Sequence, residues 1–407
     1  MYLTFAWRYF IVKKNANAIN IIAWVTVTVI AFATACQILV LSVFNGFEDL
    51  VKSLYGSFYS DIKIIPTAGK TFLLTNTQLK KIQQLQGIQA TTLVAEEKAM
   101  LQNGDAQSII HLKGIDKNYA LVSGVPNKTY QGKFDIGTID APGLIVGAGI
   151  QNAASITVEG ALQPSTVNLI LPKKTTITAN DPAKALSEGN AIATGVFSIQ
   201  QEFDNKYAIT NIEFVQQQMG FEADEYSAME IKVTPNYLPQ KIQVALKNLL
   251  GKNYVVQTKY QQNASLYSTM QLEKWVIYAV LTLILFIAAF NMISALTMLV
   301  LEKQKDINVL QSIGATTNTI LKIFLSEGML LGLVGAAIGL FLATSIGLLQ
   351  LKYKIIKLQG GSFLIDYFPV KFKLQDFCLV TFTVLFIAFL AAWFPAKKAS
   401  KQPLNLR

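Results

Sequence analysis

Few residues in this sequence have the types and the spacing that chemistry at a site requires. Gly69-Lys70-Thr71 resembles the end of a phosphate-binding loop, but that motif needs a glycine five residues before Gly69, where Ile64 stands. No GxSxG or HExxH motif is present, and the carboxylates between residues 45 and 270 are scattered. We therefore expect no catalytic residue in this chain, and no nucleotide or other cofactor bound by the chain itself.

Metal-ligating residue types are equally sparse. His111 is the only histidine, which excludes a site with several histidine ligands, and we expect it to be a polar residue on a strand. Cys36 and Cys378 both lie inside apolar stretches, and neither has the spacing of a metal ligand or of a disulfide. The sequence predicts no metal site.

The composition is that of a membrane protein. Of 407 residues, 52% are hydrophobic and only 15% are charged, against about 25% charged in ordinary soluble proteins. The net charge of +10 is not arranged as a basic stripe interleaved with aromatic residues, so we expect no nucleic acid partner. Solvent or membrane lipids are the expected surroundings of the lysines.

Four apolar runs are long enough to cross a bilayer, which takes about 20 residues. Residues 1–18, before them, are basic and aromatic and predict an interfacial helix. Four spans put both termini on one side, and the basic residues near both ends place that side in the cytoplasm. The 350–376 loop would then lie outside, although it holds five lysines, which argues against this orientation. The expected transmembrane helices are 19–44, 275–301, 320–349 and 377–394, with a cytoplasmic tail at 395–407.

Residues 45–270 differ in composition and predict an α+β domain inserted between the first two spans. Alternating runs at 61–65, 108–113 and 165–171 are typical of strands. A break near Gly220 suggests two lobes, the second at roughly 221–260. The turn-rich stretch Pro172–Ala193 is either an ordinary surface loop or a protruding hairpin that grips a soluble partner.

Residues 302–319 connect the second and third spans. Ile307, Leu310 and Ile313 fall at helical spacing in a charged segment that breaks at Gly314. Such an amphipathic helix either rests on lipid or presses on a partner. Because no nucleotide-binding motif is present in the chain, we expect this segment to receive work done by a partner. Two tandem GxxxG pairs then follow in the third span, and they predict close helix packing at Gly328, Gly332, Gly335 and Gly339.

Several stretches of this sequence resemble the MacB/FtsX class of ABC transporter permeases. They are Ala6–Tyr9, the charged segment Glu302–Ala315 with the glycines that follow it, and the closing stretch Phe394–Arg407. Leu41–Glu48 is similar to the SVMNGFE stretch of the lipoprotein-releasing branch, LolC/LolE, and Tyr367–Val370 also resembles that branch.

The resemblance implies a fold and an assembly. The fold has four transmembrane helices and a large α+β periplasmic domain between helices 1 and 2, with helix 1 continuing outward as a stalk. The assembly contains a second permease copy or a paralogue and two LolD-like ATPase subunits, which hold ATP and Mg. The implied function is extraction of lipoproteins from the inner membrane for delivery to the outer membrane, driven by mechanotransmission.

The resemblance also implies roles for particular residues. The coupling helix would run from Glu302 to Gln311 and end at Gly314. Its apolar residues Ile307, Leu310 and Ile313 would fill a groove on the ATPase, and its charged rim would be Glu302, Lys303, Lys305 and Asp306. The loop that a LolA-like periplasmic carrier would contact includes Pro172, Lys173, Lys174, Asp181 and Pro182.

Three alternatives remain open from the sequence. A MacB-like efflux permease and an FtsX-like regulator of a cell-wall hydrolase would use the same mechanical coupling to an ATPase. They would differ in the substrate or protein on which that coupling acts. A membrane-anchored extracytoplasmic enzyme is the third, although no catalytic motif supports it.

Overall fold

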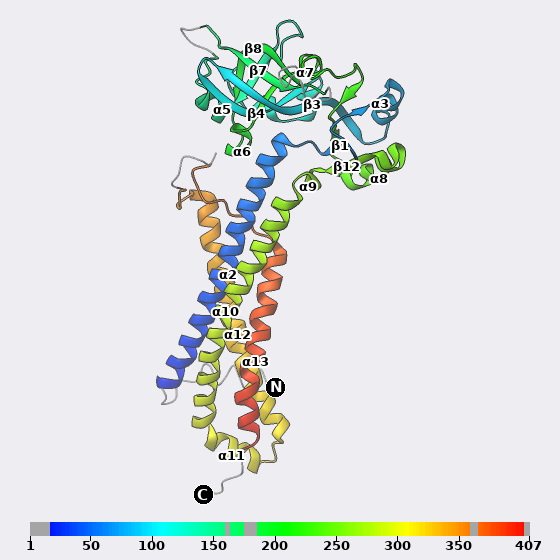
Figure 1. The fold of residues 1–407 in the computed structure, drawn as a ribbon. Coiled ribbons are helices and arrows are strands. Elements are labelled where there is room, and N and C mark those ends of the chain that lie inside the picture. The colour runs from blue at the N-terminus through cyan, green and yellow to red at the C-terminus, as the bar shows by residue number, and fades with distance from the viewer. Residues whose placement is uncertain (1–16, 159–162, 175–184, 359–364, 403–407) are drawn as a thin grey trace. The chain divides into compact units, whose positions relative to one another are not determined.

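The computed structural model describes residues 17–158, 163–174, 185–358 and 365–402, and the account below concerns these residues alone (Figure 1). The chain divides into two compact units. The bundle unit consists of Met1–Leu50, Ser268–Gln359 and Ile365–Arg407, and the outer unit of Val51–Tyr267 with Gly360–Leu364. The expected interfacial helix at 1–18 falls almost wholly outside the described residues.

Four helices in the described part of the chain are long and apolar enough to cross a membrane. The first, α2, continues well past Phe44 to Phe58, so its 42 residues extend about 63 Å, twice the roughly 30 Å of a hydrocarbon core. The predicted fold class, four such helices with an α+β domain inserted after the first, is confirmed. The helices are α2 (Asn17–Phe58), α10 (Ala264–Glu302), α12 (Thr317–Tyr353) and α13 (Leu374–Ser400).

Six of the twelve strands described in the outer unit form a closed barrel. Each strand pairs with two neighbours around the ring β3-β4-β9-β6-β8-β7, and β7 returns to pair with β3. Burial alternates along β7, where Val167, Leu169 and Leu171 point into the barrel core. The strands are β3 (Ile88–Asn103), β4 (Ala106–Ile115), β6 (Gly143–Gly147), β7 (Thr166–Pro172), β8 (Leu186–Phe197) and β9 (Tyr207–Asn211).

Two helices cover the barrel, α5 (Ala148–Ala153) and α7 (Ile212–Met219). They add Ile150 and Val215 to its core. The break expected near Gly220 is present, because Gly220 has φ +68° and ends α7. Around the barrel lie the short elements α4 (Tyr119–Val122), η1 (Val125–Lys128), β5 (Thr129–Gly132) and α6 (Gln201–Asp204).

A second hydrophobic core lies next to the barrel. The residues that form it show that the second lobe is not confined to the predicted range 221–260. It includes Ile62, Ile64 and Ile82 together with Met229 and Leu246, so a lobe confined to 221–260 lacks half of its residues. The chain forms part of this lobe before the barrel and the rest after it. A prediction that assigns one continuous segment to each lobe cannot find such an arrangement. Its elements are β1 (Ile62–Pro66), β2 (Phe72–Leu73), α3 (Asn76–Gln83), β10 (Glu225–Tyr226), β11 (Ala228–Val233), α8 (Pro239–Leu250), η3 (Gly251–Asn253), β12 (Tyr254–Thr258) and α9 (Lys259–Gln262).

Candidate functional site

The connection between α10 and α12 contains a short helix, α11 (Gln304–Ser312). It ends in a Schellman arrangement: the amide of Gly314 donates to Gln311 O at 3.0 Å and that of Ala315 donates to Leu310 O at 2.9 Å. Gly314 has φ +95°, which favours glycine. The helix therefore ends at Gly314, as expected, because the left-handed conformation of this glycine allows the capping hydrogen bonds.

One face of α11 is held by the bundle, and this corrects the role expected for Ile307. Its side chain is 1% exposed and packs in a small core with Val300, Ile320, Phe324 and Ala396. An isoleucine enclosed in this way cannot fill a groove on a partner. Ile307 fixes α11 against α10, α12 and α13.

The opposite face of α11 is open. Ile313 is 79% exposed, Val309 is 58% exposed, and Leu310 is half-buried. Val309 and Ile313 are four residues apart and share a helix face. Sequence reasoning missed Val309, although this spacing could have identified it.

The charged residues expected at the rim of α11 divide into a pair and two exposed side chains. Lys303 and Asp306 form an ion pair at 3.2 Å, three residues apart. Glu302 and Lys305 are exposed. The open face of α11 is thus a small apolar patch bordered by charges.

The four glycines of α12 serve two different partners. A β-carbon at Gly328 or Gly332 would collide with Ala392 or Ala388 of α13. One at Gly335 would come within 2.8 Å of Ile30, and one at Gly339 within 2.7 Å of Thr34, both on α2. The first GxxxG pair therefore packs α12 closely against α13, and the second pair, one turn later, packs it against α2.

A polar cluster that sequence reasoning missed joins three helices of the bundle. Lys274 Nζ of α10 lies 2.9 Å from Asp376 Oδ1 at the start of α13 and 3.0 Å from Asn45 Oδ1 of α2. The Asn45 side-chain amide also donates to Asp376 Oδ2 at 2.5 Å. Asn45 and Asp376 are buried. The available signal was the position of Lys274 and Asp376, each directly before an expected span.

Close to this cluster, the two stretches that resemble the lipoprotein-releasing branch lie against each other. The amide of Lys371 donates to Ser42 O at 2.9 Å, and the rings of Phe47 and Phe368 meet edge to face at 5.9 Å. A β-carbon on Gly46 would collide with the Pro369 carbonyl. The motif glycine is therefore needed for close approach of two backbones.

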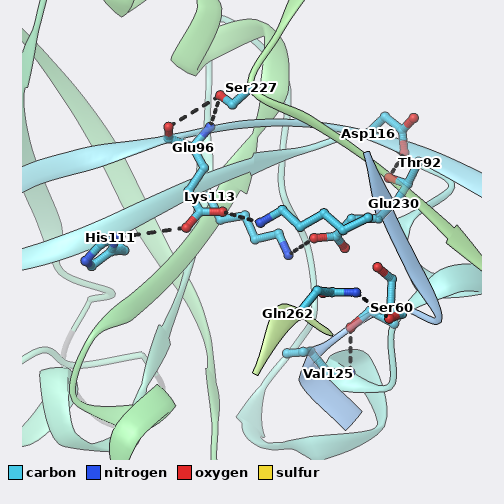
Figure 2. A network of polar contacts seen from close by, with 12 residues as sticks. Ser60, Thr92, Glu96, His111, Lys113, Asp116, Val125, Ser227, Glu230 and Gln262 are labelled. Atoms are coloured by element: carbon cyan, nitrogen blue, oxygen red, sulfur yellow. Dashed lines mark hydrogen bonds and ion pairs between the residues drawn. The ribbon is translucent and has the colours of Figure 1, made fainter. Parts of the chain in front are cut away.

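A buried charge network in the outer unit links β4 of the barrel to β11 of the second core (Figure 2). Lys113 Nζ of β4 lies 2.7 Å from Glu230 Oε1 of β11, and both residues are almost fully enclosed. The ammonium also lies 5.0 Å from the ring centre of Phe58 and 4.9 Å from that of Tyr119. Burial by itself would lower the pKa of Lys113. Glu230 and the other polar groups near the ammonium raise that pKa by more than burial lowers it, so Lys113 stays charged.

Glu96 and His111 form the more open end of this network. Glu96 Oε2 lies 3.6 Å from Lys63 Nζ, and its other oxygen lies 3.9 Å from His111 Nδ1. Burial would raise the pKa of Glu96, but Lys63, Lys113 and His111 outweigh it and hold that pKa below its ordinary value. His111 lies on β4, and no group of three or more metal-ligating side chains occurs within the described ranges.

The expected carrier loop is shorter than its predicted bounds. Residues 186–192 pair with β7 as part of β8, so only 173–185 connect the two strands. A turn-rich composition concealed this pairing, because Gly189 and Asn190 are unusual in strands. Asp181 and Pro182 lie outside the described residues.

The base of this connection is fixed to the outer unit. Pro172 ends β7, and the Lys173 amide donates to Ala185 O at 2.7 Å. Lys174 Nζ lies 2.6 Å from the buried Glu225, which also accepts a hydrogen bond from Thr71. Burial would raise the pKa of Glu225, but these hydrogen bonds lower it below its ordinary value. Lys174 therefore anchors the connection at its base.

Comparison with known proteins finds similarity to permeases. Residues 278–404 match the model described as FtsX-like permease C-terminal. The chain is 26% identical to the lipoprotein-releasing system transmembrane protein LolC of Neisseria meningitidis, with 97% of this chain and 95% of the relative covered. It is 24% identical to LolE of Haemophilus influenzae, with 98% and 97% covered. The resemblance to this class of permeases and to its lipoprotein-releasing branch is confirmed.

Among solved structures, the periplasmic region of MacB from Actinobacillus actinomycetemcomitans covers 54% of this chain. The match spans 98% of that structure, at 15% identity and a TM-score of 0.37. This similarity is too low to define a shared fold.

Proposed function

We propose that this chain, whose residues 278–404 form an FtsX-like permease domain, is the membrane subunit of an ABC transporter that releases lipoproteins from the inner membrane. Similarity to LolC and LolE over nearly the whole chain supports the substrate class. In this proposal both termini are cytoplasmic and the outer unit is periplasmic. A second permease copy or a paralogue completes the dimer.

The observation that carries the proposal is the two-sided packing of α11. Ile307 locks one face of the helix to the bundle, while Val309 and Ile313 present an apolar patch on the other. Burying two such side chains against a partner is worth about 1.5–3 kcal/mol each. We propose that a LolD-like ATPase, which holds ATP and Mg, covers this patch.

A continuous set of contacts supports mechanical transmission away from α11. The helix is fixed to the start of α12, and Gly335 and Gly339 seal α12 against α2. The same α2 ends in the outer unit, where Tyr55 and Phe58 are buried in a core with Phe203. Because α2 is one unbroken helix, we propose that it transmits a shift applied at α11 toward the outer unit.

The periplasmic end of the transport route is a narrower proposal. The connection 173–185 would contact a LolA-like carrier that accepts the lipoprotein. The ion pair of Lys174 with Glu225, which fixes the beginning of this connection to the outer unit, supports the proposal.

Depletion of this chain followed by separation of inner and outer membranes tests the function. We expect outer-membrane lipoproteins to accumulate in the inner membrane. If they leave it at the normal rate, lipoprotein release is excluded. An unchanged lipoprotein distribution with a changed sensitivity to exported toxic compounds would instead favour a MacB-like efflux permease.

A further inference from the structure

The five lysines of the 350–376 region, which oppose the expected orientation, divide into two structural classes. Lys371 and Lys373 are paired with Asp49 at 2.6 Å and Glu48 at 2.8 Å, on the outer part of α2. Lys352, Lys354 and Lys357 are exposed, and no carboxylate within the described ranges forms an ion pair with them. The first two hold the bundle together, and the other three are available to a ligand.

The three available lysines lie on a turn whose shape is fixed from inside. Gln350, which is 5% exposed, donates through its side chain to Ile356 O at 3.0 Å and to Phe368 O at 3.2 Å. It also accepts from the Ile356 amide at 2.9 Å. Lys354 ends α12 with φ +49°, a left-handed conformation that is uncommon for a residue with a side chain. This interfacial turn, residues 350–358, is therefore a built structure.

Large apolar side chains are exposed beside the lysines. Tyr353 is 61% exposed, Ile355 65% and Ile356 55%. The Lys354 ammonium lies 4.1 Å from the ring centre of Tyr367, so cation and aromatic surface are adjacent. Aromatic, aliphatic and basic side chains together are typical of the boundary between lipid chains and headgroups.

The position of the turn within the bundle agrees with that boundary. Gly347 packs against the Phe372 ring, two residues before α13 begins at Leu374. Asp376 at that end of α13 is paired with Lys274, next to the exposed Trp275. From Lys274 to Glu302, α10 extends about 42 Å, close to the roughly 40–45 Å of a bilayer with its headgroups. The turn thus lies at the end of the bundle where these helices leave the membrane.

We propose that the interfacial turn binds the phosphate headgroup of an anionic phospholipid in the leaflet at this end of the bundle. Lys352, Lys354 and Lys357 supply three positive charges, and Asp366 is the one exposed carboxylate among the described residues of 350–376. Ile355 and Ile356 would contact the upper acyl chains of the same lipid. The proposal requires only that the bundle spans a membrane, so it stands or falls separately from lipoprotein release.

The test is a lipid titration of the purified full-length chain in detergent, followed by native mass spectrometry. We expect phosphatidylglycerol to bind at least about tenfold more tightly than phosphatidylcholine, because each lysine near such a surface contributes roughly a factor of five. In the K352Q/K354Q/K357Q variant this preference should fall to about twofold or less. The K352R/K354R/K357R variant keeps the charges and should retain it.

A matched control removes the same number of charges from exposed helices of the outer unit, as K80Q/K81Q/K241Q, and should leave the preference intact. The proposal is overturned if the turn variant keeps the wild-type preference or if the control loses it equally. It is also overturned if millimolar inorganic phosphate displaces the lipid as effectively as phosphatidylglycerol does, since the turn would then be a small-anion site. Thermal unfolding of each variant verifies that the fold is retained.

Discussion

The bundle unit and the outer unit achieve close packing in opposite ways. Where the helices of the bundle cross, glycine and alanine replace larger side chains: Gly332 lies against Ala388, and Gly339 against Ala31. The outer unit fills a closed barrel with branched residues such as Leu112, Val146 and Leu169. Helices in lipid gain little from burying more apolar surface, so they gain from close backbone approach, whereas a water-exposed domain gains most from apolar area.

Buried charge shows the same contrast. Lys113 and Glu230 are enclosed on all sides and connect the barrel to the second core. Lys274 and Asp376 are placed at one end of the bundle, where the lysine remains partly exposed. Charges inside a bilayer are costly, which agrees with the position of this ion pair near water. The comparison predicts how each unit responds to substitution.

The largest effect should come from breaking the buried pair of the outer unit. Glu230→Ala removes the carboxylate that the enclosed Lys113 ammonium contacts at 2.7 Å, and we expect it to destabilise the outer unit by about 3–5 kcal/mol. Hydrogen exchange of the β4 and β11 amides in the full-length chain measures this. The double variant K113M/E230L should recover most of the loss. Equal destabilisation in the double variant would contradict the view that unpaired charge is the cause.

An intermediate effect is expected at the glycine seams. Gly332→Val should separate α12 from α13 and Gly339→Val should separate α12 from α2, each costing about 1–3 kcal/mol through overpacking. The thermal midpoint of the purified chain in detergent reports the loss. Ala337→Val, on an exposed face of the same helix, is the matched control. If the control lowers the midpoint as much, close packing at the glycines is not the cause.

The smallest effect is a pH dependence at the base of the 173–185 connection. The pKa of Glu225 is lower in the folded chain than its unfolded value of about 4.3. Its contribution is therefore complete above that unfolded value and is lost as the pH falls through the folded value. The protection of the Lys174 amide against hydrogen exchange, relative to the intrinsic rate at the same pH, should therefore fall in the wild type as the pH drops below that unfolded value. Glu225→Gln should exchange faster already at neutral pH, and a wild-type rate there would argue against the anchor.

The sequence predicts those features that depend on local pattern. Apolar runs give the four helices, the helical spacing of Ile307 and Ile313 gives α11, and Gly314 gives its end. What local pattern cannot give is the direction in which a side chain faces. Ile307 and Ile313 have the same chemistry, yet one is enclosed by three other helices and the other is open.

Contacts between segments that are far apart in the sequence also could not be predicted. Strands β1 and β11 are separated by more than 160 residues, so their shared core was invisible to a contiguous reading. The Asn45, Lys274 and Asp376 cluster likewise brings together three separate helices. In both cases the residues show ordinary local patterns, and only the tertiary fold identifies them.

The central claim is that the open face of α11 receives the ATPase, and its most direct test is co-purification of the ATPase with variants of this chain. Ile313→Glu places a charge in the apolar patch and should weaken ATPase binding by about tenfold or more. Val244→Glu, at an exposed apolar residue of α8 in the outer unit, is the matched control. Ile307→Ala should lower the thermal midpoint of the bundle instead. Full retention of the ATPase by the Ile313→Glu and Val309→Glu variants would contradict the account.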